Sequence, residues 1–285
     1  MSIDESVNVA AISAELQSLQ KQRAWYLKSR NMIANRLQAT VAGTIGYHTN
    51  MEESKRKGVF AEATKLIRQT VDGDAEPECK SLILTTMIAV NAYNHAKTAI
   101  EKEMTKAVKS LPIAEWVAQP DQRGFGILFT GIIIGETGDL CNYANPGKVW
   151  RRLGCAPWTK DGETLMGATW KGRSKSKGNK LHAADWEEFG YSPRRRSIAY
   201  LIGDGLIKQN GDGPYRARWL EAKVRALETH PEWEWKPCEK CKTAEGTCRT
   251  CGGTGQKCGH AHNHGMLLAS KLLLKNLWIE WTLNT

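Results

Sequence analysis

The sequence has no long hydrophobic run, because polar residues interrupt every stretch long enough to cross a bilayer. Its first six residues have neither the basic start nor the apolar continuation of a secretory signal. The first absence argues against a membrane-spanning helix, and the second against secretion. We therefore expect a cytoplasmic protein without a membrane partner.

Residues 1–118 lack the alternation of apolar and polar side chains that marks β-strands. A nuclease core built on a sheet, with acidic residues at the strand ends, therefore has no place there. One apolar stripe instead keeps the heptad spacing of a coiled coil, and two arginines interrupt it. Its members are Ile12, Leu16, Leu19, Arg23, Tyr26, Arg30, Ile33 and Leu37. The stripe predicts one long helix, either packed on its own domain or paired with a second copy.

Two further helical patterns follow in the same region. The stripe between Val59 and Ile67 ends at a turn-like segment, residues 72–74. A third helix is expected from Lys80 to Leu111, where Pro112 blocks its continuation. Its apolar side chains are Leu84, Met87, Ile88, Tyr93, Ile100, Met104 and Val108. The predicted fold class is therefore mainly α, with a long N-terminal helical hairpin or coiled coil.

A polar boundary at residues 118–123 leads into a second region. There a Gly-x-Gly turn precedes an apolar helix, residues 127–134, which Gly138 closes. Asn145 is expected to cap the next helix, which ends at Gly154. This order is typical of a helix-hairpin-helix, whose turn amides approach a DNA phosphate, although Gly-x-Gly is also a common tight turn. The candidate phosphate-binding residues are Gly124, Gly126, Lys148, Arg151 and Arg152.

Positive charge is concentrated further along, in a chain with 40 Lys+Arg against 30 Asp+Glu and a formal net charge of +10. Such an excess favours a polyanionic partner. A glycine-flanked loop and a second basic run, which starts a helix at residues 198–207, are the candidate contacts with the nucleic-acid backbone, DNA or RNA. They comprise Lys171, Arg173, Lys175, Lys177, Asn179, Lys180, Arg194, Arg195 and Arg196.

The cysteines are concentrated near the C-terminus. Two Cys-x-x-Cys pairs, Cys238 with Cys241 and Cys248 with Cys251, have the spacing of a four-thiolate zinc site. Because four thiolates leave no open position for water, we expect a structural Zn²⁺. A second site is the alternative use of Cys258, His260, His262 and His264, although Asn263 or His264 is the expected cap of a helix from Met266 to Trp281.

With these motifs identified, the chain resembles the C-terminal transposase domain of the IS110/IS116-type insertion-sequence family. The resemblance covers roughly residues 118–285 and rests on the order of four stretches. These are the glycine turn and helix at 126–140, the Leu-Gly-x-x-Pro segment at 149–157, the Gly-Arg…Gly-Asn loop at 171–180, and the His-x-x-Asn entry to the last helix at 259–281.

The resemblance implies DNA strand exchange by a serine nucleophile, together with a RuvC-like domain of four acidic ligands and a structured guide RNA. Two departures are visible: no acidic sheet domain precedes the coiled coil, and Asp161 lies near the position of the expected serine. Other hydroxyl groups are candidate nucleophiles, with Mg²⁺ required only if the protein is catalytic. They are Thr159, Thr164, Ser174 and Ser176.

We therefore predict a DNA-binding, transposase- or recombinase-like protein of a mobile element or phage. The alternative is a non-catalytic accessory protein that dimerises and holds DNA or RNA for another factor. DNA, a structured RNA and a second copy of the chain are the expected partners. The expected domains are a helical hairpin at 1–118, a helix-hairpin-helix domain at 119–236, a zinc insertion at 237–260 and a closing helix at 261–285.

Overall fold

The fold is mainly α-helical, as the sequence predicts. The computed structural model describes residues 8–156, 159–160, 163–164, 192–209, 211, 213–243, 248, 251 and 254–284. The strands in these ranges form two short antiparallel pairs, β1 (Thr159–Lys160) with β2 (Glu163–Thr164), and β3 (Lys236–Pro237) with β4 (Gln256–Lys257). None of the described helices is both long and apolar enough to cross a membrane.

The chain divides into two compact units. One unit is Ser18–Met104, which we name the hairpin unit, and it lies inside the expected 1–118 domain. The other, which we name the core unit, combines the residues up to Gln17 with those from Thr105 onward. The division falls within two long helices, α1 (Val9–Thr44) and α3 (Lys80–Lys109).

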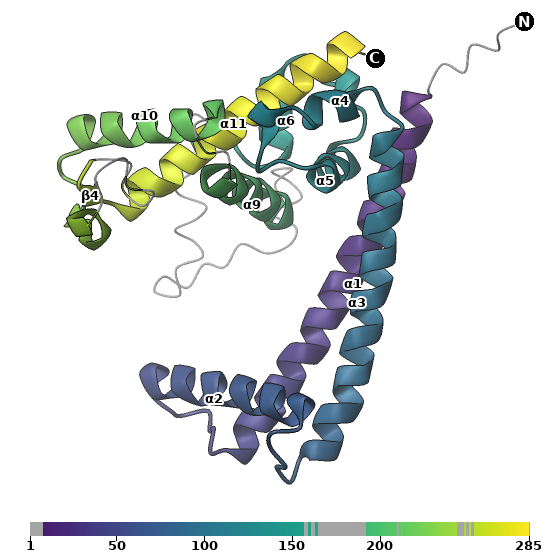
Figure 1. Cartoon of the computed structure of the whole chain (residues 1–285), viewed down its shortest axis with the longest axis vertical. Coiled ribbons are helices and arrows are strands. Elements are labelled where there is room, and N and C mark those ends of the chain that lie inside the picture. Colours follow the sequence, from purple (N-terminus) through teal and green to yellow (C-terminus); the bar gives the residue numbers. More distant parts are fainter. Residues whose placement is uncertain are drawn as a thin grey trace, which may run out of the picture. The chain divides into compact units, whose positions relative to one another are not determined.

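Within the hairpin unit, α1 and α3 lie side by side, and α2 (Glu53–Asp72) packs near the end where they turn (Figure 1). Gly73 ends α2 in the left-handed conformation, with φ of 86°, as the predicted turn requires. The expected α2 stripe is confirmed, because its apolar side chains pack against one buried cluster. The buried members of that cluster are Leu37, Val41, Ala42, Ala63 and Ile83.

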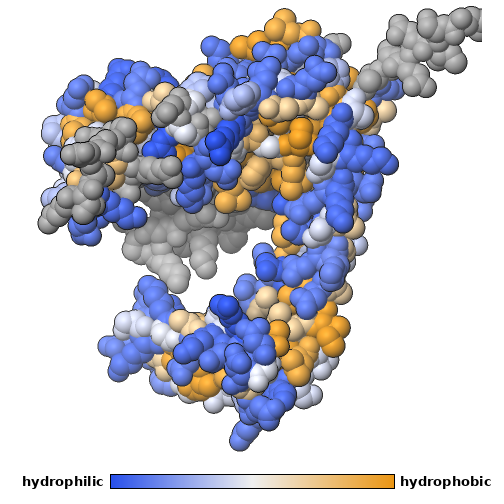
Figure 2. Space-filling view, viewed as in Figure 1, coloured by the Kyte–Doolittle hydropathy of each residue, from blue (hydrophilic) through white to orange (hydrophobic). Residues whose placement is uncertain are grey.

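The long first helix is confirmed, and Arg23, one of its two polar interruptions, has a partner within the same unit. Arg23 donates to the Glu101 carboxylate at 2.8 Å, and Lys97 lies 2.9 Å from the same carboxylate. The predicted stripe of α3 is partly wrong, because Leu84 and Ile88 are exposed. Figure 2 shows apolar residues at the surface of this unit. Pairing with a second copy stays a prediction.

The core unit is assembled around its last helix, α11 (Gly259–Asn284), against which α4, η2, α6, α9 and α10 pack (Figure 1). The apolar face of α11 is fully buried at Leu273, Leu277 and Trp281. The remaining elements are α4 (Ile113–Val117), η1 (Pro120–Gln122), α5 (Ile127–Thr137), η2 (Leu140–Asn142), α6 (Pro146–Arg152), α9 (Pro193–Gln209), α10 (Pro214–Thr229) and η4 (Glu239–Thr243).

Hydrogen bonds from indole N–H groups connect α11 to the elements that precede it in the chain. Trp150 of α6 donates to the Lys271 carbonyl at 3.0 Å, and Trp281 donates to the Asp139 carboxylate at 2.9 Å. Each bond satisfies a polar atom on an otherwise apolar contact, which fixes how the helices meet. Trp150 and Trp281 therefore help to fix the packing of α11.

Two predicted helix caps in the core unit are confirmed. Gly138 closes α5, and the Asn145 side chain accepts from the Lys148 amide at 3.2 Å to begin α6. The cap predicted at Asn263 or His264 is wrong, because α11 already begins at Gly259. The histidines of this segment are helical, and Cys258 precedes the first turn.

Candidate metal centre and nucleic-acid interface

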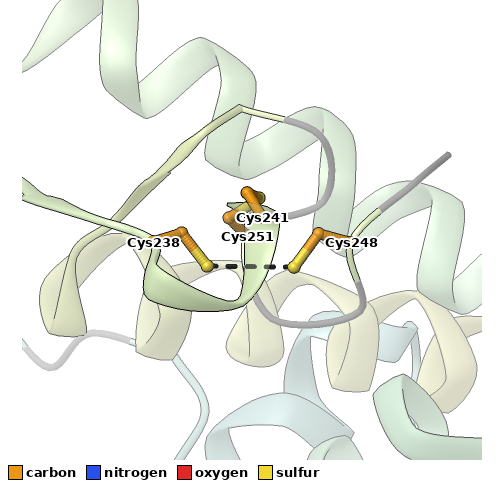
Figure 3. Close-up of side chains that lie close together, drawn as sticks. All are labelled: Cys238, Cys241, Cys248 and Cys251. Carbon is orange, nitrogen blue, oxygen red and sulfur yellow. Dashed lines mark hydrogen bonds between the residues drawn. The ribbon is translucent and has the colours of Figure 1, made fainter. Parts of the chain in front are cut away.

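Four cysteine side chains converge in the core unit, as Figure 3 shows. The sulfur atoms of Cys238, Cys241, Cys248 and Cys251 all lie within 4.8 Å of one another. Three of the four cysteines are buried, and Cys241 is partly exposed. These are the residues predicted from the Cys-x-x-Cys spacing, and together they could hold a metal ion.

Local backbone structure explains how the first pair reaches the centre. The Cys238 amide donates to the Gly255 carbonyl at 2.8 Å, which joins the two arms of the β3–β4 ribbon. The Cys241 amide then donates to the Cys238 carbonyl at 3.0 Å, and this tight turn puts both sulfurs on one side. Gly255 has φ of 69°, a conformation that glycine adopts without strain.

One of the two sulfur–sulfur distances matches the edge of a tetrahedral zinc–thiolate site, and the other is shorter than that edge. A zinc–sulfur bond of about 2.3 Å gives a tetrahedral edge of about 3.8 Å. The distance between the Cys238 and Cys248 sulfurs is 3.8 Å, and that between Cys241 and Cys251 is 2.9 Å. A disulfide would need about 2.05 Å, so neither pair is bonded. The shorter edge would have to open on metal binding.

The close sulfurs also affect protonation. Hydrogen bonding to Cys251 and, next, burial raise the pKa of the Cys241 thiol. Four thiolates repel one another without a cation, and a bound divalent ion removes that penalty by coordinating all four. Across the described residues, these cysteines form the one group of three or more histidine, cysteine or acidic side chains placed to share an ion.

A buried lysine, Lys223 of α10, lies close to this centre. Its side chain is almost inaccessible, and its ammonium lies 4.5 Å from the ring centre of Trp219. Burial lowers the pKa of Lys223, and negative charge on the cysteines, Cys251 above all, opposes that shift. Sequence reasoning missed Lys223, because a lysine in an amphipathic helix ordinarily faces solvent.

The histidines near the centre do not join a metal site. His260, His262 and His264 lie on the first turns of α11, and the His262 ring packs edge-on against Trp219 at 5.6 Å. Burial lowers the pKa values of His262 and His264. The alternative of a second site with Cys258 is not supported by their placement.

The Gly-x-Gly turn has a packing role at its first glycine. Gly124 has φ of 97°, and a β-carbon there would lie 2.8 Å from the Gly205 carbonyl oxygen of α9. The close backbone approach at Gly124 is therefore to another helix of the core unit. Gly126 immediately precedes α5 and has open space where a β-carbon would lie, so no close packing requires a glycine there. A helix-hairpin-helix stays a prediction.

The candidate cations of α6 divide into two kinds. Lys148 and Arg151 are exposed, whereas Arg152 donates to the Glu136 carbonyl at 3.2 Å. Glu136 lies at the end of α5, and its side chain is only 1% exposed. Sequence reasoning missed this residue, although a lone carboxylate in an apolar helix could have drawn attention to it.

The second basic run, at the start of α9, also contacts Glu136. Arg194 and Arg195 of α9 donate to the Glu136 carboxylate at 2.8 and 3.1 Å. Arg196 donates to the Gly154 carbonyl at 3.1 Å, which joins the chain before residue 157 to the chain after residue 191. Burial lowers the pKa of Arg195, and its bond with Glu136 acts in the opposite direction.

We name Arg152, Arg194, Arg195 and Arg196 the arginine stem. Its residues were predicted as direct contacts with nucleic acid, and the structure shows that each also holds another part of the core unit. The side chain of Arg194 remains 48% exposed, whereas that of Arg195 is 19% exposed. Of these two arginines, Arg194 therefore offers the larger exposed surface.

Several candidates lie outside the described residues. Among them are the loop cations and the candidate serines, that is Lys171, Arg173, Ser174, Lys175, Ser176, Lys177, Asn179 and Lys180. Thr159 and Thr164 are described only at the backbone, where they are paired across β1 and β2.

Comparison of the chain with known protein families, with curated proteins and with solved structures finds no match. The resemblance to a transposase domain consequently rests on the sequence motifs.

Proposed function

We propose that this protein binds the sugar–phosphate backbone of nucleic acid, with DNA as the preferred partner. The binding residues are those of the arginine stem and of the basic Lys171–Lys180 loop. The observation that carries the proposal is the meeting of the stem's cations at Glu136 and Gly154. Gly154 comes before the basic loop in the sequence, and Arg194, Arg195 and Arg196 come after it.

Charge balance supports the proposal. The stem has four guanidinium groups, and the single carboxylate of Glu136 can neutralise only one of them. The excess charge lies at a surface where Arg194 is half exposed. Arginine pairs well with phosphate because its planar donors match two phosphate oxygens. Such contacts position a protein on nucleic acid without reading its sequence.

We also propose that Zn²⁺ is the ion of the four-cysteine centre and that its role is structural. Four thiolates are a soft donor set that suits zinc, and they leave no open position for water or substrate. Zinc with four thiolates has a net charge of −2, which the nearby buried ammonium of Lys223 would partly offset. The ion would therefore hold the β3–β4 ribbon together with the turns that carry the four cysteines.

The test of nucleic-acid binding is fluorescence anisotropy with duplex, branched and single-stranded DNA and with structured RNA. We expect Arg194→Gln to weaken binding and reduce its salt dependence. Arg68→Gln is the matched control, because Arg68 is an exposed arginine of the hairpin unit. Absence of affinity for every probe would overturn the proposal. A preference for structured RNA over duplex DNA would change the partner and keep the binding surface.

Within this function, we propose a transposase-like role on the strength of the sequence motifs. A non-catalytic accessory role is the second candidate, and it is favoured by Asp161, which lies near the position where the family that the chain resembles has its serine. A strand-transfer assay on the element's own DNA ends with Mg²⁺ separates them. A covalent protein–DNA adduct that disappears on changing one serine or threonine supports catalysis. Stable binding without cleavage supports the accessory role.

A further inference from the structure

A pocket of about 400 Å³ opens beside the cysteine centre, where the β3–β4 ribbon, α10 and the start of α11 meet. Its lining includes Lys223 of α10, Lys236 of β3, Lys257 of β4 and His262 of α11. We name it the lysine pocket. None of its three lysines belongs to the basic segments identified from the sequence.

The two lysines of the β3–β4 ribbon lie where their like charges repel each other. Lys236 and Lys257 are directly opposite each other across the antiparallel pair. Like charges in that relation destabilise a ribbon unless an anion lies between or beside them. Glu234 meets Lys236 at 2.7 Å, but within the described part of the chain Lys257 forms no ion pair with a carboxylate. The half-buried Lys257 is therefore available to an external anion.

Two more features add positive potential to the same pocket. Lys223 contributes an ammonium that is almost entirely removed from water, where a charge acts more strongly on its neighbours. The long helix α11 begins at Gly259, which also lines the pocket, so the positive end of its dipole lies there. The lining holds three lysines and one glutamate. Because Lys223 also faces the cysteine centre and Lys236 is paired with Glu234, Lys257 is the lining cation whose charge is left for an external anion.

We propose that the lysine pocket binds a phosphate group, and that in the complex this is a phosphate of the nucleic-acid backbone. The inference rests on the proposed function and extends it to a second contact, on elements distinct from the arginine stem. The cysteine centre shapes this contact, because Cys238 follows β3 directly and its amide bonds Gly255 just before β4.

The experiment uses the full chain and three variants. Lys257→Gln removes the charge, Lys257→Arg retains it, and Lys275→Gln is the control, because Lys275 is an exposed lysine of α11 outside the pocket lining. Circular dichroism and the thermal midpoint establish that each variant is folded. Each is then titrated with inorganic phosphate in an amide-resolved NMR experiment and with labelled DNA in anisotropy measurements over a range of salt concentrations.

We expect saturable shifts of the Gly259 and His262 amides with inorganic phosphate, lost in Lys257→Gln and kept in Lys257→Arg and Lys275→Gln. With duplex DNA, Lys257→Gln should reduce the slope of log affinity against log salt by about 0.9, the value for one phosphate contact. If the unaltered protein binds DNA but the slope is unchanged in Lys257→Gln, the proposed phosphate site is wrong and the proposed function still holds. Phosphate-induced shifts without binding of any nucleic acid would support the pocket and overturn the proposed function.

Discussion

Glu136 is the carboxylate on which Arg194 and Arg195 converge, and its replacement by glutamine tests whether the arginine stem holds the core unit together. The Glu136 side chain is 1% exposed, so Glu136→Gln leaves two guanidinium groups beside a neutral amide in a buried place. Removing one member of a buried ion pair costs about 3–5 kcal/mol. An exposed pair contributes about 0.2–1 kcal/mol, which is the range for the half-exposed Arg194.

The amide oxygen of glutamine can still accept one hydrogen bond from Arg195, which recovers about 1 kcal/mol. We therefore expect Glu136→Gln to lower the free energy of unfolding by about 3 kcal/mol, and the thermal midpoint by roughly 6–12 °C for a unit of this size. Calorimetry measures both. Glu228→Gln is the control, because Glu228 is an exposed glutamate of α10 in the same unit. A change below about 1 °C in Glu136→Gln would refute this reasoning.

Three further predictions concern packing, pH and metal. Gly124→Ala should destabilise the fold by about 1–3 kcal/mol in denaturant titrations, because φ is positive there and the new carbon would meet the Gly205 carbonyl; an unchanged midpoint would contradict this packing. Tyr215→Phe removes the 2.6 Å bond to the buried Gln122 amide oxygen and should cost about 1–2 kcal/mol at neutral pH. Burial raises the pKa of Tyr215 in the folded state, so its neutral form stabilises the fold below pH 10, and stability is lost as the pH rises above that value. Thermal midpoints between pH 8 and 11 should therefore fall less steeply in the phenylalanine variant, and parallel curves would contradict it. Elemental analysis should find about one zinc per chain, absent from Cys248→Ser, and chelation should abolish the phosphate-induced shifts in the lysine pocket; two zincs would restore the histidine site.

The sequence predicted most helices because their signals are local. The stripe of α2, the glycine that closes α5 and the asparagine that begins α6 each specify a conformation through nearby residues. The cysteine centre was equally predictable, since both pairs have knuckle spacing. The start of α11 was placed too late, because glycine and histidines at 259–265 have modest helix propensity, and packing against α10 overrides it.

The roles of single side chains depended on contacts distant in sequence. Arg195 and Glu136 are far apart along the chain, and no local pattern indicates that they pair. The same holds for Gly124, whose neighbour is the backbone of α9, and for Lys223, whose surroundings are set by the cysteine centre. Residue types therefore predicted a cationic surface, and only the tertiary structure separated cations that hold the fold from those that stay exposed.

The salt dependence of nucleic-acid affinity tests the central claim most directly. If the stem, the basic loop and the lysine pocket together engage about six phosphates, log affinity for duplex DNA should fall against log salt with a slope of roughly −5. Anisotropy titrations of the full chain from low to physiological salt measure that slope. A slope near −5 that becomes shallower in Arg194→Gln and Lys257→Gln is the expected result. An affinity that does not change with salt would contradict backbone binding.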